Sequence, residues 1–183
     1  ALMVTIWSTQ HPTALALLRS GKPYRVSQVD VRRHGEFSED WDHFSPAYGW
    51  MEQQYRVRVG SLPTSRALVW AWYKPKPDLR RAMWKGIPRP FALLTLRVDP
   101  DRLLVSDWED WHQVLNYAPI APRGLEHDGE AWDRWADETY AWPKAKKQAT
   151  WSRIFQPAYM GSYCQAVLAE IRPADVVSAK LYS

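Results

Sequence analysis

Residues 67–73 read Ala-Leu-Val-Trp-Ala-Trp-Tyr, and this run decides the fold. Its aliphatic and aromatic residues favour a β-strand. The Lys-Pro-Lys-Pro that follows ends the strand, because proline cannot donate a hydrogen bond to a neighbouring strand. Successive side chains of a strand point to opposite faces, so Trp70 and Trp72 share one face. Two indoles on one face can line a groove.

Further strand signals lie on both sides of this run. The apolar stretch FALLTLRV ends at Asp99-Pro100 and predicts a second long strand. The chain closes with two more apolar stretches, which we expect to turn at Arg172-Pro173. The full set of predicted strands is residues 3–8, 67–73, 91–98, 103–105, 164–171 and 175–182.

Helical signals fill the segments between these strands. Pro12 suits the first turn of a helix that ends at Gly21, and Ser45 followed by Pro46 is typical of another helix start. Ser106 and Glu109 form a capping box, which predicts a helix start at Ser106. We expect helices at residues 12–21, 45–60, 106–115, 130–140 and 144–155, and a surface loop or lid at residues 28–43.

Strands at both ends with helices between them predict an α+β fold, with a mixed or mostly antiparallel sheet flanked by helices. The length of 183 residues fits a single domain over residues 1–183.

The composition narrows the class of protein. Twelve tryptophans are too many to be core filler alone, because a buried indole N–H needs a partner, so some are expected to line a cleft or an interface. The net charge of +4 is compatible with nucleotide or nucleic-acid phosphates without requiring them. A single cysteine, Cys164, excludes a disulfide framework. No apolar stretch approaches the ~20 residues that span a bilayer, and residues 1–9 lack a signal-peptide pattern. We therefore expect a cytoplasmic protein without membrane contact.

Familiar catalytic signatures are missing from the sequence. It has no glycine-rich phosphate loop, no zinc-protease H-E-x-x-H and no G-x-S-x-G nucleophile motif. Its five histidines are scattered without the spacing of metal ligands on a helix, so the sequence predicts no metal site.

The first cluster that could carry chemistry is the stretch from Ser106 to His112. Trp108 and His112 lie four residues apart and share a helix face, next to Asp107. Asp107 and His112 are candidate acid/base groups, and the histidine could instead bind a phosphate. The alternative is structural: Ser106 and Asp107 cap the helix, and His112 makes a hydrogen bond inside the fold.

The second cluster is aromatic. An aromatic pocket of this kind could stack a purine or a nicotinamide ring. The alternative is ordinary packing of a helix against a sheet. The cluster comprises Tyr48, Trp50 and Met51 together with Trp70, Trp72 and Tyr73.

A basic run follows near Trp151, with Lys144, Lys146, Lys147 and Arg153 as its members. Such a run contacts RNA or DNA phosphates in some proteins and is a solvated helix face in many others.

Five motifs in this order resemble a bacterial family known as a domain of unknown function (number 3841). The resemblance covers nearly the whole chain and predicts membership of that family without implying an activity. The motifs are IWSTQ at residues 6–10, YGWM at 48–51, WAWY at 70–73, LVSDW at 104–108 and WSRIF at 151–155.

A weaker resemblance links the two ends of the chain to ADP-ribosyltransferases that modify nucleic acids or proteins. It rests on IWSTQ with a helix ending at Gly21, and on the closing stretch QAVLAEIRPADVV. The resemblance implies NAD as cofactor, a late acidic residue that stabilises the oxocarbenium-like transition state, and a role as a toxin or defence factor. The matching position here is the neutral Gln165, and Glu170 is predicted to face the other side of the strand. A carboxylate from elsewhere, such as Asp107 or Glu109, could replace it.

Two hypotheses follow. In the first, the chain is an ADP-ribosyltransferase-like enzyme with catalytic residues Gln165, Asp107 and His112. NAD then binds between Trp7, Gln10, Tyr48, Trp50 and Trp72. In the second, the same Trp-rich cleft holds a nucleotide or single-stranded RNA without turnover.

Overall fold

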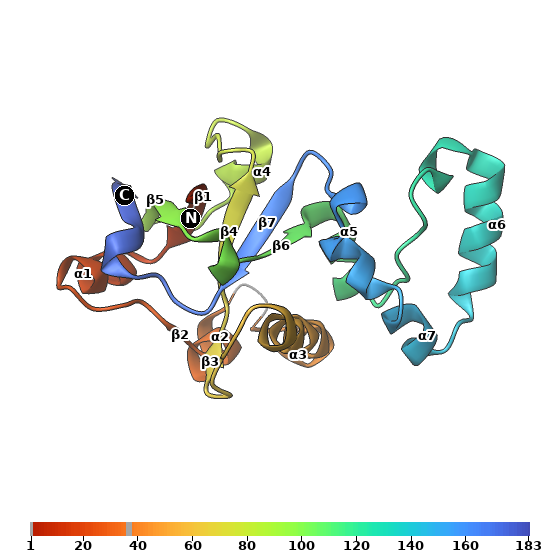
Figure 1. The fold of residues 1–183 in the computed structure, drawn as a ribbon, viewed down its shortest axis with the longest axis horizontal. Coiled ribbons are helices and arrows are strands. Elements are labelled where there is room, and N and C mark those ends of the chain that lie inside the picture. Colours follow the sequence, from red (N-terminus) through yellow and green to blue (C-terminus); the bar gives the residue numbers. More distant parts are fainter. Residues whose placement is uncertain (1, 36–37) are drawn as a thin grey trace.

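The computed structural model describes residues 2–35 and 38–183. Its centre is a six-stranded sheet in the order β6-β7-β4-β1-β5-β8, in which every neighbouring pair is antiparallel (Figure 1). The predicted α+β fold with a mostly antiparallel sheet is confirmed. The strands of this sheet are β1 Val4–Gln10, β4 Val69–Lys74, β5 Phe91–Val98, β6 Leu104–Asp107, β7 Cys164–Leu168 and β8 Val176–Tyr182.

The remaining elements cover the sheet or extend from it. A short ribbon pairs β2 (Val26–Ser27) with β3 (Arg66–Ala67). A 3-10 turn at Trp151–Phe155 leads back toward β7. The helices are α1 Pro12–Arg19, α2 Gln28–His34, α3 Trp41–Arg58, α4 Ala82–Lys85, α5 Trp108–Leu115, α6 Gly129–Tyr140 and α7 Lys144–Gln148.

The sheet separates two apolar cores. On one face α1 packs Leu15 and Leu18 against Ile6 of β1 and Leu94 of β5. On the other face, α3, α5 and the turn at Trp151–Phe155 bury side chains such as Met51, Trp111 and Trp151 against β7. Because strand side chains alternate between faces, residues such as Trp70 and Trp72 face α3 and α5, while Ala71 faces α1.

Several predicted boundaries were wrong, and packing explains the errors. Residues 28–34 form α2, capped by the Ser27 hydroxyl, which accepts from the Val29 amide. None of its residues is buried, so no apolar periodicity marked the helix. Residues 36–37 of the predicted loop lie outside the described residues. Helix α3 starts at Trp41, so Ser45 is not its cap and Pro46 lies inside it.

Two further corrections concern the second half of the chain. The predicted capping box at Ser106 is wrong: Ser106 belongs to β6, and Asp107 caps α5. The helix predicted at residues 144–155 ends at Gln148. There the Thr150 hydroxyl donates to the Lys147 carbonyl and accepts from the Ile120 amide, which fixes the change of direction.

The two closing strands are present, but they are not neighbours. β7 lies between β6 and β4, whereas β8 forms the opposite edge beside β5. Between them, Ile171 and Tyr24 exchange two backbone hydrogen bonds of 2.8 and 3.0 Å. This bridge ties the connection to the segment before β2 and carries the chain to the far edge.

Candidate functional site

A row of four paired residues crosses the sheet. Trp7 of β1 pairs with Trp72 of β4, and Trp72 pairs with Gln165 of β7. Gln165 in turn pairs with Ser106 of β6. Directly paired residues project to the same face of a sheet. The register therefore sets two indoles, an amide and a hydroxyl side by side.

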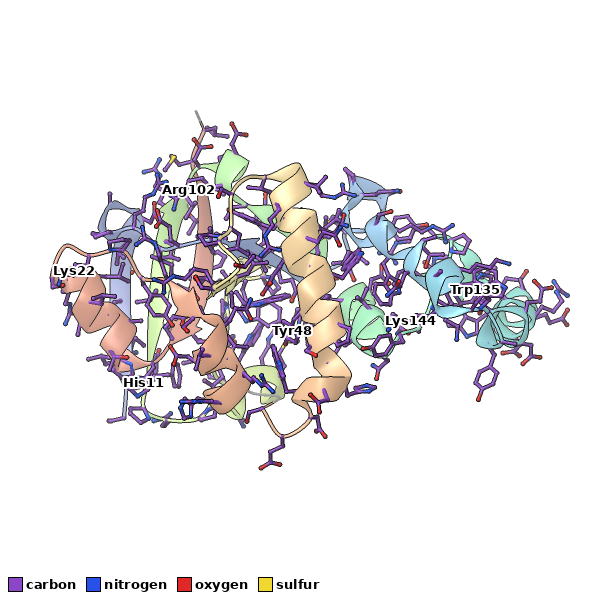
Figure 2. All side chains as sticks on the ribbon, turned by 90° about the horizontal axis from the view of Figure 1, so that it is seen from below. His11, Lys22, Tyr48, Arg102, Trp135 and Lys144 are labelled. Atoms are coloured by element: carbon purple, nitrogen blue, oxygen red, sulfur yellow. The ribbon has the colours of Figure 1, made fainter. Side chains whose placement is uncertain are left out.

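Three residues of this row, Trp7, Trp72 and Gln165, form the floor of a cleft of about 810 Å³. Tyr48 and Glu52 of α3 line one wall, and Trp108 and His112 of α5 line another. Figure 2 labels Tyr48 on α3, the long helix over this face of the sheet. The segment after β4 contributes Trp84. The cleft is thus built from elements that lie far apart in the sequence.

Aromatic rings surround the floor in two groups. In the first, Trp72 packs against Trp84 and Trp108, with ring centroids 5.6 and 5.8 Å apart. In the second, Trp70 lies 5.1 Å from Trp111 and 5.6 Å from Tyr48. These offset and edge-to-face contacts hold the rings in fixed orientations. The cleft therefore has a rigid aromatic lining.

Two indole N–H groups in this lining have no acceptor within residues 2–35 and 38–183. They belong to Trp7 and Trp84, and both Nε1 atoms are buried. The Trp84 side chain is only 2% exposed. By contrast, the buried Trp151 donates to the Ala118 carbonyl at 2.8 Å. A buried donor without an acceptor is rare and unfavourable, so each of these two N–H groups lowers the stability of the fold.

Gln165 lies at the bottom of the cleft and is 6% exposed. Its amide nitrogen donates to the Ser106 hydroxyl at 3.2 Å. This bond fixes the amide so that its carbonyl oxygen remains available as an acceptor.

His112 has a defined tautomer. Its Nδ1 lies 2.7 Å from the Trp108 carbonyl, and its ring packs edge-on against the Trp108 ring at 4.2 Å. A carbonyl oxygen can only accept, so Nδ1 carries the proton and the neutral ring keeps a lone pair on Nε2. His112 can therefore accept a proton in the cleft.

Strand β1 lines the cleft beside β4. Trp7 and Trp72 form the one registered pair between β1 and β4. Beyond it, the Ser8 hydroxyl donates to the Trp70 carbonyl at 2.7 Å, and the Gln10 amide donates to Ser8 at 2.8 Å. These side-chain hydrogen bonds connect β1 to β4 beyond the paired residues, and Gln10 lines the cleft at this end of β1.

Two predicted site residues lie elsewhere. Asp107 is buried outside the cleft lining, where its carboxylate accepts from the amides of Asp110 and Gly161, both at 2.8 Å. Trp50 packs against Trp151 and Phe155 on another face of α3. Residues two apart on a helix point in different directions, so Tyr48 and Trp50 cannot line one pocket. The other six predicted site residues line the cleft: Trp7, Gln10, Tyr48, Trp72, His112 and Gln165.

The sequence reasoning missed Asp30 and Glu52, the carboxylates among the described residues that line the cleft. Glu52 accepts from the Gln28 amide at 2.5 Å and lies 3.8 Å from Arg56. Burial raises the pKa of Glu52 above its ordinary value, although Gln28 and Arg56 oppose the shift. The spacing of four residues between Tyr48 and Glu52 puts both on one helix face, and that signal could have found Glu52.

The basic run is split by the fold. Lys144 and Lys146 lie over the rings of Tyr117 and Trp142, at 4.8 and 3.9 Å. Lys147 donates to the Tyr140 carbonyl. Arg153 donates to the Ile120 carbonyl at 2.6 Å in the body of the molecule. The three lysines belong to α7, whereas Arg153 has a structural bond of its own.

A family model described as Domain of unknown function (DUF3841) matches residues 5–177. The chain belongs to this family. The match includes the whole sheet except Val4 of β1 and residues 178–182 of β8, so it covers the floor of the cleft. No curated protein and no solved structure matches the chain significantly. The resemblance to ADP-ribosyltransferases stays a prediction.

The described residues contain neither a metal-binding cluster nor a membrane-spanning helix. Across residues 2–35 and 38–183, no group of three or more His, Cys, Asp or Glu side chains is arranged to hold a metal ion. In the same residues, no helix has the length and apolar character needed to cross a bilayer.

Proposed function

We propose that the family's Trp-rich cleft binds a nucleotide, with NAD as the first candidate. The observation that carries the proposal is the in-register row Trp7–Trp72–Gln165, which sets two indoles and an amide side by side in the cleft. Stacking of a base on an aromatic side chain contributes about 1–3 kcal/mol. The Gln165 amide then adds direction, because its carbonyl oxygen can accept a hydrogen bond from the ligand.

The size of the cleft supports this proposal. A volume of about 810 Å³ lies within the range of roughly 300–1,000 Å³ that is typical of small-molecule sites. Such sites are mostly apolar and contain a few fixed polar groups. Here the fixed polar groups are the Gln165 amide and the His112 imidazole.

For the reaction, we propose ADP-ribosyl transfer to a nucleic acid or protein, as in a toxin or defence factor. The bond between ribose C1′ and nicotinamide breaks, and its electron pair leaves with neutral nicotinamide. An oxygen or nitrogen of the target bonds to C1′ and gives up its proton, for which His112 Nε2 is the acceptor in the cleft. The Gln165 carbonyl dipole supports the developing positive charge, less strongly than a carboxylate would.

A non-catalytic nucleotide- or RNA-binding module is the second candidate. It is favoured by the neutral side chain of Gln165 and by the engagement of Asp107 in two backbone hydrogen bonds. With a neutral amide at the position where the resemblance expects an acidic residue, binding without turnover is the expected behaviour. The two functions share the cleft and differ in the release of nicotinamide.

The test is calorimetric titration with NAD, paired with an assay for released nicotinamide. Trp72→Ala removes the central ring of the floor, and we expect at least about a tenfold loss of affinity from the lost stacking. Trp132→Ala is the matched control, because Trp132 is an exposed indole on α6. It should leave the affinity unchanged.

Gln165→Met tests the amide while it keeps most of the buried volume. Truncation to alanine is a poor test, since Gln165 is buried and the smaller side chain would leave a cavity. Binding with release supports transfer, and binding without release supports the module. Absence of both heat and release with the intact protein removes NAD from the proposal.

A further inference from the structure

A second cavity lies away from the Trp-rich cleft, at the C-terminal end of α3. Its volume is about 690 Å³. Figure 2 shows the separation: Arg102, which lines this cavity, lies toward one end of α3, and Tyr48 of the Trp-rich cleft lies toward the other. Its charged lining consists of Arg25, Arg66, Arg102 and Arg172 with the carboxylates Asp101 and Glu170. Arginines outnumber carboxylates two to one.

One of the arginines, Arg102, makes its hydrogen bonds to acceptors within the protein. Arg102 makes two hydrogen bonds to the buried Asp175, at 2.7 and 3.0 Å, and a third to the Glu170 carbonyl at 3.1 Å. This buried pair anchors the connection between β7 and β8. Arg102 is therefore a structural part of the wall.

Two other arginines share one carboxylate. Arg25 lies 2.7 Å from Glu170 Oε2, and Arg172 lies 3.0 Å from Oε1. Burial alone raises the pKa of Glu170, but the hydrogen bonds from Arg172 and Arg25 bring it below its ordinary value. Glu170 stays ionised and holds the two guanidinium groups at the cavity mouth. One negative charge faces two positive ones, so positive charge remains for a ligand.

Arg66 has no ion-pair partner among the described residues, although its side chain is half-buried. Its backbone is fixed, because its amide donates to the Pro63 carbonyl at 2.9 Å and its carbonyl accepts from Gln28 at 3.0 Å. A partly desolvated guanidinium without a counter-charge is unfavourable. An anion in the cavity relieves that cost.

We propose that this cavity binds the phosphate groups of a small phosphorylated ligand. Guanidinium groups bind phosphate through paired N–H donors, which suits Arg66, Arg25 and Arg172. Ser61 and Ser65 line the same cavity and add hydroxyl donors. The limited volume of about 690 Å³ favours a compact ligand over a continuous nucleic-acid backbone.

The site is separate from the Trp-rich cleft, and the β2–β3 ribbon lies between the two. Val26 and Ala67 of this ribbon line the Trp-rich cleft, whereas their chain neighbours Arg25 and Arg66 line the arginine cavity. Successive side chains of an extended chain point to opposite sides. The proposal stands whether or not the Trp-rich cleft binds NAD.

The test is calorimetric titration of the full chain with inorganic pyrophosphate at low salt, supported by thermal unfolding with and without it. We expect saturable binding and a higher unfolding temperature, because a ligand that binds the folded state stabilises it. Arg66→Ala should weaken binding at least about tenfold, and Arg66→Lys should recover part of the loss as a point charge. Trp72→Ala should leave pyrophosphate binding intact.

Arg134→Ala is the matched control, since it removes the same charge from the exposed face of α6. An equal loss in Arg134→Ala, or no saturable binding to the intact protein, would overturn the proposal. A single-stranded RNA that binds more tightly than pyrophosphate, and equally depends on Arg66, would also overturn it in favour of a nucleic-acid site.

Discussion

Asp107 is a buried carboxylate whose hydrogen bonds serve the fold. It joins the end of β6, the start of α5 and the segment before β7 through its bonds to Asp110 and Gly161. A β-carbon added at Gly161 would lie 2.9 Å from the Asp107 carboxylate, which shows how closely the two segments fit. The acid/base role predicted for Asp107 is therefore replaced by a structural one in our proposal.

Asp107→Ala should lower the free energy of unfolding by about 2–3 kcal/mol, because it removes a helix cap and the acceptor of the Gly161 amide. Urea unfolding measures the loss. Glu109→Ala, an exposed change in the same helical turn, should stay within about 0.5 kcal/mol of the native chain. If folded Asp107→Ala lost all affinity for NAD while keeping its stability, Asp107 would belong to the site after all.

Asp110 makes the free energy of unfolding depend on pH. Burial raises its pKa from 3.8 to about 6, against the opposing effect of Arg123 and with smaller contributions from Asp107, Glu109 and Glu126. Arg123 lies 3.4 Å from the Asp110 carboxylate. Between these two pKa values the folded chain binds more protons than the unfolded chain. The stability due to Asp110 is therefore complete below about pH 4 and falls as the pH rises through about 6.

Asp110→Asn should remove this pH dependence, because asparagine resembles the protonated acid. We expect a gain of about 1–2 kcal/mol at pH 7 and little gain at pH 4. Urea unfolding at several pH values measures both. Asp133→Asn on the exposed surface of α6 is the control. A loss of stability at pH 7 in Asp110→Asn would show that the ion pair with Arg123 outweighs the burial of Asp110.

At the scale of elements, helix α3 lines both cavities. Its sequence contains a glycine that lowers its stability. Gly49 lies in its middle, is exposed, and has nothing within 4 Å of where a β-carbon would be. Gly49→Ala should stabilise the protein by about 0.5–1 kcal/mol in thermal or urea unfolding. Gly21→Ala is the contrasting variant. Gly21 follows α1 with a φ of +82°, so alanine there should destabilise the fold. Equal effects of the two changes would contradict the argument.

The sequence predicted the elements that carry a strong apolar pattern. β5 has the predicted bounds, and β4 and α5 each begin within two residues of their predicted starts. Helix α2 was missed because it buries no residue. The strand order could not be predicted, since it depends on the Tyr24–Ile171 bridge between segments far apart in the chain.

The candidate site was predictable to the extent that local spacing places its residues. Alternation along β4 put Trp72 on the right face, and the resemblance to ADP-ribosyltransferases brought Trp7 and Gln165 into the same hypothesis. Trp50 was misplaced because Tyr48 and Trp50, which are two positions apart on α3, were assigned to the same helix face. Arg66 was missed, because nothing in its local sequence shows that its charge lacks a partner.

At the scale of the whole molecule, residues 121–149 form an arm beyond the sheet, with α6 and α7 in it (Figure 1). The arm adds little to the body: Thr139 is the buried residue of α6, and α7 buries none. Its ends are tied together. The Ile120 amide donates to the Thr150 hydroxyl at 2.8 Å, and Trp151 donates to the Ala118 carbonyl at 2.8 Å.

Because its ends meet, the arm should be removable. Replacement of residues 122–148 by a linker of about four glycine and serine residues should leave a cooperatively folding body, since a shorter closed loop loses less chain entropy on folding. We expect a loss of about 1–3 kcal/mol, measured by urea unfolding, because Arg123 pairs with Asp110 and also donates to the carbonyls of Ala158 and Tyr159. NAD and pyrophosphate should bind the shortened chain as they bind the full one, because no residue of the arm lines either cavity. A shortened chain that folds but binds neither ligand would mean that the arm completes a site, and one that fails to fold would mean that the body depends on it.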